Sequence, residues 1–296
     1  MENVQSLIQG IQSGDFRLLA RGLTLVENNL KFADDLLRTI EVNNKVPIIG
    51  ITGPPGAGKS TLVNAIISIA VADGKRIAIL AVDPTSPFNF GSLLGDRIRM
   101  AQQFNKPGVF IRSVATRGAL GGISAKTIEM VDVLKAAGFD LILVETVGVG
   151  QSELEIAGLA DQTIVVLVPE SGDEIQNIKS GLMEIAQAFV VNKADRQGAS
   201  QFANNLKKMV FQQHQDIPVF KTIADKSEGV TVLYKWMLSA ESGSDDRKNH
   251  LLADKAFRLI QYYRTIDLDR NALLNEIATA SAAQDFNIYR FIDTWR

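Results

Sequence analysis

Short apolar runs alternate with longer amphipathic stretches through the middle of the chain. Each run is four to seven residues long and nearly continuous, which is typical of strands buried on both faces of a sheet. The stretches between them predict helices that begin near Ser60, Ser124, Glu174, Ser200 and Val230. The runs are Ile48–Thr52, Arg76–Val82, Val109–Val114, Asp140–Val144, Thr163–Val168, Ala188–Val191 and Val219–Thr222. This alternation predicts an α/β fold with a mostly parallel sheet flanked by helices.

The two ends of the chain have helical periodicity and no strand pattern. Residues 1–45 carry an apolar stripe that is interrupted at Gly14–Asp15, where Asp15 can cap a second helix. After a polar break at residues 241–249, another stripe begins at Leu252. We therefore predict an N-terminal helical extension (1–45), a nucleotide-binding domain (46–240) and a C-terminal helical arm (241–296). The arm needs a cover for its apolar face, either its own domain or, as we favour, a second subunit in a homodimer.

Composition excludes several classes of protein. The 296 residues include no cysteine and two histidines, so disulfides, thiolate metal sites and thiol nucleophiles are excluded. A net charge of −2 without a long basic run argues against a nucleic-acid partner. The N-terminus lacks the pattern of a signal peptide, and no stretch of about 20 apolar residues suggests a membrane span. We expect a cytoplasmic protein with no membrane partner.

A glycine-rich loop follows the first strand. It reads Gly53-Pro54-Pro55-Gly56-Ala57-Gly58-Lys59-Ser60-Thr61 and fits the pattern G-x-x-x-x-G-K-[ST] between a strand and a helix. Backbone N–H groups in such a loop, together with the N-terminus of the helix, bind phosphate oxygens. Lys59 is expected to reach the β- and γ-phosphates, and the Ser60 hydroxyl to bind Mg²⁺. The loop predicts a nucleoside triphosphate site.

A second motif indicates which base is bound. Asn192-Lys193-Ala194-Asp195 follows the sixth strand and fits N-K-x-D. The carboxylate of Asp195 can accept hydrogen bonds from N1–H and the exocyclic amine of guanine, a pair of donors that adenine lacks. Asn192 can bond the base edge, and the Lys193 stem can lie over the ring. Thr222-Ile223-Ala224 stands where a Ser-Ala pair is usual, and its N–H groups could bond the guanine carbonyl.

Three further segments carry candidate metal ligands and switch residues. Glu145 ends a strand next to the loop and can hold Mg²⁺, and Asp83 and Asp96 can complete its shell. Arg117, in a glycine-rich stretch, is either a phosphate or partner contact or a solvated surface charge. The stretch from Pro169 to Lys179, which includes Asp173, is either a capped helix start or a further switch or partner-contact segment.

The motifs together resemble the MeaB/ArgK/MMAA family of GTPases over about residues 10–225. The resemblance rests on residues 53–61, 81–86, 95–97, 145–153, 173–179 and 192–195, and on the helical stretch 14–27. It implies a homodimeric, GTP-hydrolysing chaperone of an adenosylcobalamin-dependent acyl-CoA mutase, typically methylmalonyl-CoA mutase, which gates cofactor loading and protects the mutase. It also implies that Lys59 contacts phosphates, that Ser60, Asp83, Asp96 and Glu145 serve Mg²⁺, and that Asp173 and Lys179 couple the mutase to the GTPase site.

Two other functions use the same kind of loop. A metal-delivery GTPase of the hydrogenase or urease maturation type shares the sheet, but the chain has no cysteine cluster to hold its cargo. An older label for the same family, a kinase of amino-acid transport, requires a base that positions a phosphate acceptor, and no dedicated residue stands out. Lys59, Asp96 and Glu145 are the residues that we expect to support GTP hydrolysis.

Overall fold

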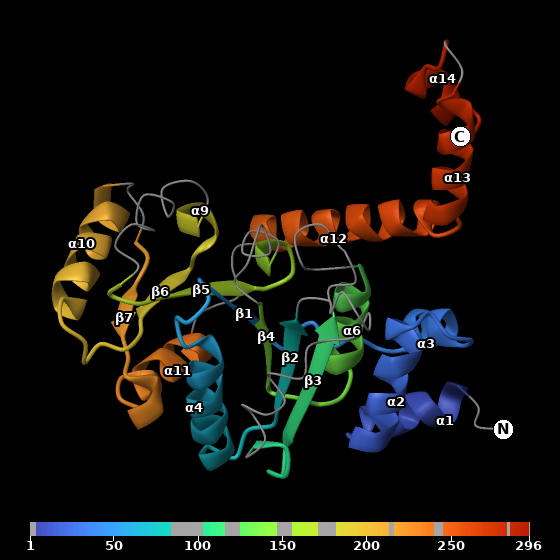
Figure 1. Ribbon diagram of the computed structural model, residues 1–296. Helices are drawn as coiled ribbons and strands as arrows, with labels where there is room; N and C mark the ends of the chain where they lie inside the picture. The colour runs from blue at the N-terminus through green and yellow to red at the C-terminus, as the bar shows by residue number, and fades with distance from the viewer. Residues whose placement is uncertain are drawn as a thin grey trace. The chain divides into compact units, whose positions relative to one another are not determined.

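The computed structural model describes residues 4–83, 103–115, 125–146, 156–170, 182–212, 216–239, 245–282 and 285–295. These residues form a seven-stranded parallel sheet in the order β3-β2-β4-β1-β5-β6-β7 (Figure 1). The predicted α/β fold is confirmed. The strands are β1 (Ile48–Thr52), β2 (Ile77–Asp83), β3 (Val109–Ala115), β4 (Leu141–Glu145), β5 (Gln162–Leu167), β6 (Ala188–Val191) and β7 (Val219–Lys221).

Helices cover both faces of this sheet. On one face lie α4 and α11; on the other, α6 and the N-terminal helices cover the half near β2 to β4, and α9 and α10 cover the half near β5 to β7 (Figure 1). The described helices before the C-terminal region are α1 (Val4–Gln12), α2 (Phe16–Glu27), α3 (Ala33–Thr39), α4 (Lys59–Ala72), α6 (Ala125–Lys135), α9 (Met183–Ile185), α10 (Ala199–Gln212) and α11 (Val230–Ser239), with 3₁₀ turns η2 (Ile156–Gly158) and η4 (Ala224–Lys226).

The central strands are apolar on both faces because both faces are covered. In β1, Ile49 and Ile51 pack into the layer of α4 and α11. Gly50, between them, points to the other face, where an added Cβ would come within 2.6 Å of the Ile156 side chain in η2. The close approach of η2 therefore requires glycine at this position. Side chains of one strand alternate between the two layers, as the pleat requires.

A buried tyrosine joins the two helices of the first layer. The Tyr234 hydroxyl in α11 donates a hydrogen bond to Asp73 Oδ2, 3.1 Å away at the C-terminal end of α4. Burial, and then this bond to a carboxylate, raise the pKa of Tyr234 to about 12. The neutral phenol is thus the form that the fold stabilises.

The N-terminal helices are packed onto the sheet domain. Asp15 caps α2, as predicted, and accepts from the backbone N–H groups of Arg17 and Leu18 at 2.7 and 3.1 Å. The apolar stripe is buried, with Ile11, Leu19 and Leu23 fully inaccessible. The N-terminal extension is thus packed against the core of the first unit.

Two arginines, Arg76 directly before β2 and Arg112 in β3, strengthen that contact. The Arg76 guanidinium lies 5.7 Å from the Phe16 ring and 5.4 Å from the Phe139 ring, in cation–π range of both. Arg112 in β3 donates to Glu27 Oε2 in α2 at 2.5 Å. The N-terminal helices are therefore joined to β2 and β3 by charged as well as apolar contacts.

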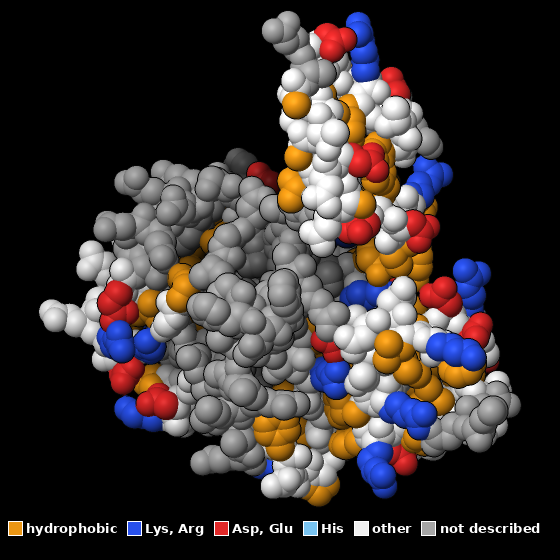
Figure 2. All heavy atoms as spheres, turned by 45° about the vertical axis from the view of Figure 1, so that its right-hand side comes forward, with side chains coloured by type: hydrophobic (Ala, Val, Ile, Leu, Met, Phe, Trp, Pro, Cys, Tyr) orange, Lys and Arg blue, Asp and Glu red, His pale blue; other side chains and the backbone are white. Residues whose placement is uncertain are grey.

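The chain divides into two compact units, residues 1–252 and 253–296. The second unit comprises most of α12 (Asp245–Thr265), with α13 (Arg270–Ala280) and α14 (Ile288–Asp293). Hydrophobic side chains lie at the surface of these helices (Figure 2). They include Phe257, Ile260, Tyr263, Ile266, Leu268, Leu274, Ile288, Tyr289 and Ile292. The three-part division at residues 45 and 240 stays a prediction.

Within the described ranges, the helices are too short or too polar to cross a bilayer.

Candidate functional site

The glycine-rich loop connects β1 to α4 and takes a path that only glycine permits. Gly53 has φ +138°, and a Cβ there would lie 2.1 Å from the carbonyl oxygen of Val166 in β5. Gly58 has φ +88° and forms the N-cap of α4 without a side-chain cap. The first turn of α4 thus has no side-chain cap from its N-cap residue, and phosphate is the usual external acceptor at such a helix N-terminus.

Lys59 lies inside the curve of this loop. Its side chain is buried, with only 7% of the residue accessible. Its Nζ donates to the carbonyl oxygens of Gly53 at 2.7 Å and of Pro54 at 3.1 Å. A buried ammonium at the mouth of a helix N-terminus is a strong attraction for an anion. Lys59 is thus placed where the motif requires a phosphate-binding cation.

Ser60 and Glu145 meet beside the loop. The Ser60 hydroxyl donates to Glu145 Oε1 at 2.7 Å, and Glu145 is 4% accessible. The pairing of β1 with β4, in register at Ile51 and Glu145, sets this contact. A hydroxyl and a carboxylate oxygen are the ligand types that Mg²⁺ prefers. The residues present therefore fit a magnesium ion, although the sequence alone did not show that they touch.

The other candidate metal and switch residues are located only in part. Asp83 is the last residue of β2 and pairs with Ala115 of β3, so its backbone is at the same edge of the sheet as Glu145. The side chain of Asp83 lies outside the description. Asp96, Arg117, Asp173 and Lys179 also lie outside the described residues.

Asn192 ties the base-side motif to the glycine-rich loop. Its Nδ2 donates to the carbonyl oxygen of Ala57 at 2.9 Å, and it is buried. Its Oδ1 accepts from the Thr222 hydroxyl at 3.0 Å and from the Ala224 N–H at 3.2 Å. One amide thus holds the residue 57 backbone, the N-K-x-D motif and the 222–224 segment together. In the 222–224 segment, the backbone of Ile223 exchanges hydrogen bonds with the backbone of Glu228.

Lys193 and Asp195 complete the same motif on the exposed side. Lys193 adopts φ +53° and its Nζ donates to the carbonyl oxygen of Gly56 at 2.7 Å. Asp195 projects a half-exposed carboxylate, whose Oδ2 lies 3.7 Å from Lys226 Nζ in η4. The buried Asn192 is therefore structural as well as a candidate base contact, whereas the Asp195 carboxylate is accessible to a ligand.

Sequence reasoning missed two cations at this edge. Lys226 contacts Asp195, and Arg196 donates to Glu170 beyond the end of β5. The hydrogen bond from Arg196 holds the pKa of Glu170 below its usual range. The position of Arg196 directly after the motif was a signal, but its distant partner could not be found without the tertiary structure.

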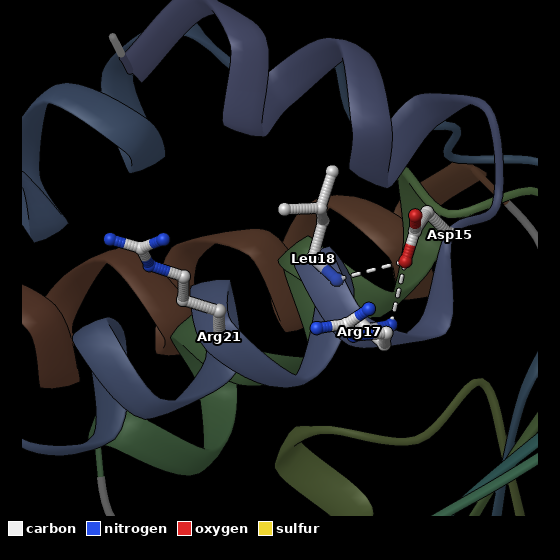
Figure 3. Close-up of a pocket in the computed structure, with 4 residues that line it drawn as sticks. All are labelled: Asp15, Arg17, Leu18 and Arg21. Carbon is white, nitrogen blue, oxygen red and sulfur yellow. Dashed lines mark hydrogen bonds between the residues drawn. The ribbon is translucent and has the colours of Figure 1, made fainter. Parts of the chain in front are cut away.

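A separate hollow lies on the N-terminal helices, which precede the glycine-rich loop in the sequence. It has a volume of about 320 Å³ and is lined by Asp15, Arg17, Leu18 and Arg21 (Figure 3). The dashed lines in Figure 3 mark the bonds that Asp15 accepts from the backbone at the start of α2. The Asp15 carboxylate that lines this hollow already serves as the cap of α2.

Comparison with known proteins identifies a family. A family model described as "Methylmalonyl Co-A mutase-associated GTPase MeaB" matches residues 19–270. A "putative GTPase" of Pyrococcus horikoshii is 46% identical over 243 residues, which cover 79% of this chain and 77% of that protein. A mouse relative, "Methylmalonic aciduria type A homolog, mitochondrial", is 35% identical over 257 residues, 79% of this chain and 62% of its own.

A solved structure has the same fold along almost the whole chain. The crystal structure of an LAO/AO transport system kinase aligns with a TM-score of 0.69 and 25% identity, covering 98% of this chain and 90% of its own. The family named from the sequence motifs and the fold predicted from the apolar runs are both confirmed by these similarities.

Proposed function

This chain belongs to the MeaB family of methylmalonyl-CoA mutase-associated GTPases, and from that premise we propose that it is a GTP-dependent chaperone of an adenosylcobalamin-dependent acyl-CoA mutase. GTP binding and hydrolysis would gate loading of the mutase cofactor and protect the mutase. The observation that carries the GTPase part is the joined site, in which Asn192 bonds both the Ala57 carbonyl and the Ala224 N–H. The mutase part is supported by the family description.

The phosphates of GTP would be bound by Gly53 to Thr61. We propose that Lys59 gives up its bonds to the Gly53 and Pro54 carbonyls and donates to the β- and γ-phosphates instead. Because the ammonium is already buried and positioned, little side-chain entropy remains to be lost when phosphate binds. Charge neutralisation by this lysine is its contribution to hydrolysis.

Mg²⁺ would be held by the Ser60 hydroxyl and by Glu145, directly or through water, with Asp83 and Asp96 as further candidates. The 2.7 Å contact between Ser60 and Glu145 supports this, because both oxygens already face one point. The ion supplies positive charge for the developing negative charge on the phosphates. Replacing Glu145 with Gln is expected to raise the Mg²⁺ concentration that gives half-maximal GTP hydrolysis, because a charged ligand of the ion is lost.

Guanine would be selected by Asp195, with the Ala224 N–H near the base carbonyl and the Lys193 stem against the ring. Asp195→Asn converts an acceptor pair into a donor and an acceptor. We expect it to reduce GDP affinity by about 100-fold or more and to raise affinity for xanthosine diphosphate. Lys59→Ala should abolish hydrolysis. Unchanged GDP affinity in Asp195→Asn would contradict the base assignment, and normal turnover in Lys59→Ala would contradict the phosphate assignment.

The partner is tested by steady-state GTP hydrolysis with and without a purified adenosylcobalamin-dependent acyl-CoA mutase from the same source. We expect stimulation by the mutase, no turnover of ATP, and loss of stimulation when Asp173 or Lys179 is replaced. Arg117 is the third candidate coupling residue. If no such mutase changed the rate of GTP turnover, the GTPase activity would stand but the mutase would be refuted as the partner. A metal-delivery or transport-linked role would then be favoured.

The dimer is proposed from the exposed apolar side chains of residues 253–296. Phe257 is 61% accessible, and Ile260 and Leu274 are exposed as well. A second copy of this unit would cover them. The association is measured by sedimentation of the full-length protein over a range of concentrations.

A further inference from the structure

The carboxylate proposed to read guanine has a cationic neighbour. Lys226 Nζ, at the end of η4, lies 3.7 Å from Asp195 Oδ2. We propose that Lys226 is a positioning residue for Asp195: it orients the carboxylate toward the base, offsets its charge, and so contributes to selectivity for guanine. This inference rests on the base site proposed above and extends it by one residue.

The turn that carries Lys226 is held in one shape. Ile223 and Glu228 exchange two backbone hydrogen bonds, at 3.0 and 3.2 Å. Ser227 follows with φ +58°, and Gly229 has φ +75°. A Cβ on Gly229 would lie 2.2 Å from the carbonyl oxygen of Lys221, so the end of the turn passes close to β7 and requires glycine there. The Cα of Lys226 is therefore presented to the base site from a fixed position.

Asp195 is anchored to the same part of the structure. The N–H of its neighbour Ala194 donates to the carbonyl oxygen of Thr222 at 3.0 Å. The amide of Asn192 accepts from the Ala224 N–H, two residues before Lys226. Both ends of the ion pair thus start from one hydrogen-bonded network. Forming the pair costs the rotamer freedom of two side chains but no backbone ordering.

A carboxylate needs such a partner to face a base in one orientation. The terminal torsion of an aspartate is broad, so an exposed carboxylate by itself samples many orientations. Its two oxygens offer about four acceptor positions, which leaves room for one lysine and two guanine donors together. The lysine on Oδ2 restricts the torsion and reduces the cost of placing a negative group near a nucleotide. Guanine then meets an acceptor pair that is already oriented.

The expected effect is moderate because the pair is in contact with water. The side chains of Lys226 and Asp195 are 56% and 45% accessible. Exposed ion pairs of this kind change an equilibrium constant by about 2- to 5-fold. The effect should be the same for GDP and GTP, because the contact is at the base. It should also shrink between 0.05 and about 1 M salt, as the Debye length falls to about 3 Å.

The first measurement is the Kd for GDP, by calorimetry at low salt, for the wild type, Lys226→Met and Lys226→Arg. Lys221→Met is the matched control: it removes the same charge from β7, where Lys221 Nζ contacts Ser200 Oγ at 3.4 Å. We expect a loss of about 2- to 5-fold for Lys226→Met, little change for Lys221→Met, and recovery in Lys226→Arg. Equal GDP affinity of Lys226→Met and the wild type would overturn the proposal.

The second measurement isolates the route through Asp195. In an Asp195→Asn background, the partner of Lys226 is a neutral amide, so Lys226→Met should no longer change the Kd for xanthosine diphosphate. An undiminished loss there would mean that Lys226 acts on the turn or on the nucleotide itself, and would overturn the positioning role. The single variant Asp195→Asn tests the base site separately. If that variant still preferred guanine, the proposed base site itself would be refuted.

Discussion

The N-terminal and C-terminal helices of this chain have similar amphipathic patterns. The apolar side chains of the first are buried, whereas those of the last are exposed. Leu19 and Leu23 of α2 are fully buried against neighbouring helices of the first unit. Phe257 and Ile260 of α12 are exposed within theirs. An apolar stripe predicts that a helix has a face to bury, but it does not identify the surface that buries it. The contrast can be tested with matched variants at the two ends.

Contacts outside the stripe account for the difference at the N-terminal end. Arg76, directly before β2, and Arg112 in β3 contact Phe16 and Glu27 of α2. Asp15 satisfies the backbone at the start of the same helix. The N-terminal helices are therefore part of the cooperative unit 1–252, and changes in them should be felt throughout that unit.

The largest effect is expected from a cavity in α2. Leu23→Ala removes a fully buried side chain and should lower the free energy of unfolding by about 2–5 kcal/mol. Unfolding in urea is followed by Trp236 fluorescence in a Trp295→Phe background, because the two tryptophans lie in different units. The matched variant is Leu274→Ala in α13, which is 64% accessible and should change this transition by less than about 0.5 kcal/mol. Similar losses for both would refute the contrast.

The next effect is expected from the ion pair between β3 and α2. Arg112→Met removes the charged hydrogen bond that Arg112 donates to the mostly buried Glu27 and should cost about 1–3 kcal/mol. Lys75→Met is the control, because the pair of Lys75 with Asp140 is much more exposed and should contribute less than about 1 kcal/mol. Both are measured in the same urea series. An equal cost at the two sites would mean that the Arg112–Glu27 pair contributes no more than an exposed ion pair.

A smaller effect, on association rather than folding, is expected at the C-terminal end. The double variant Phe257→Ser and Ile260→Ser removes two large exposed apolar groups. We expect the dimer Kd to rise by about 10-fold or more. The Trp236 transition, measured at protein concentrations well below the dimer Kd, should be unchanged. Sedimentation equilibrium gives the Kd, and a monomeric wild type at every concentration would refute the dimer.

The smallest effect compares two aspartate caps. Asp15 caps α2 by accepting from the N–H groups of Arg17 and Leu18, and Asp269 caps α13 by accepting from the N–H of Asn271. Asp15→Ala should cost about 1 kcal/mol in the Trp236 transition. Asp269→Ala should fray α13, seen as faster amide exchange there, and leave that transition in place. A shift of the Trp236 midpoint by Asp269→Ala would show that the two units unfold together.

Much of the nucleotide site could be predicted because its determinants are local. A glycine that must adopt positive φ, as at Gly58, has to appear in the sequence itself. Lys59 and Ser60 follow directly and can be identified by their spacing. The spatial neighbours of these residues could not be predicted: Ser60 meets Glu145 across 85 positions and Asn192 meets Ala57 across 135. No spacing rule links residues so far apart.

Sequence by itself therefore determined the strand–helix alternation, the phosphate loop, the base motif and the family, since each depends on the periodicity or order of neighbouring residues. Only the tertiary structure decided which side chains meet at the sheet edge, where strand register brings Glu145 beside the loop and the η4 turn brings Lys226 to Asp195. It also decided that the first helices are buried while the last ones are exposed within their unit. The physical reason is that burial and ion pairing depend on the surface opposite a residue, which distant parts of the chain supply.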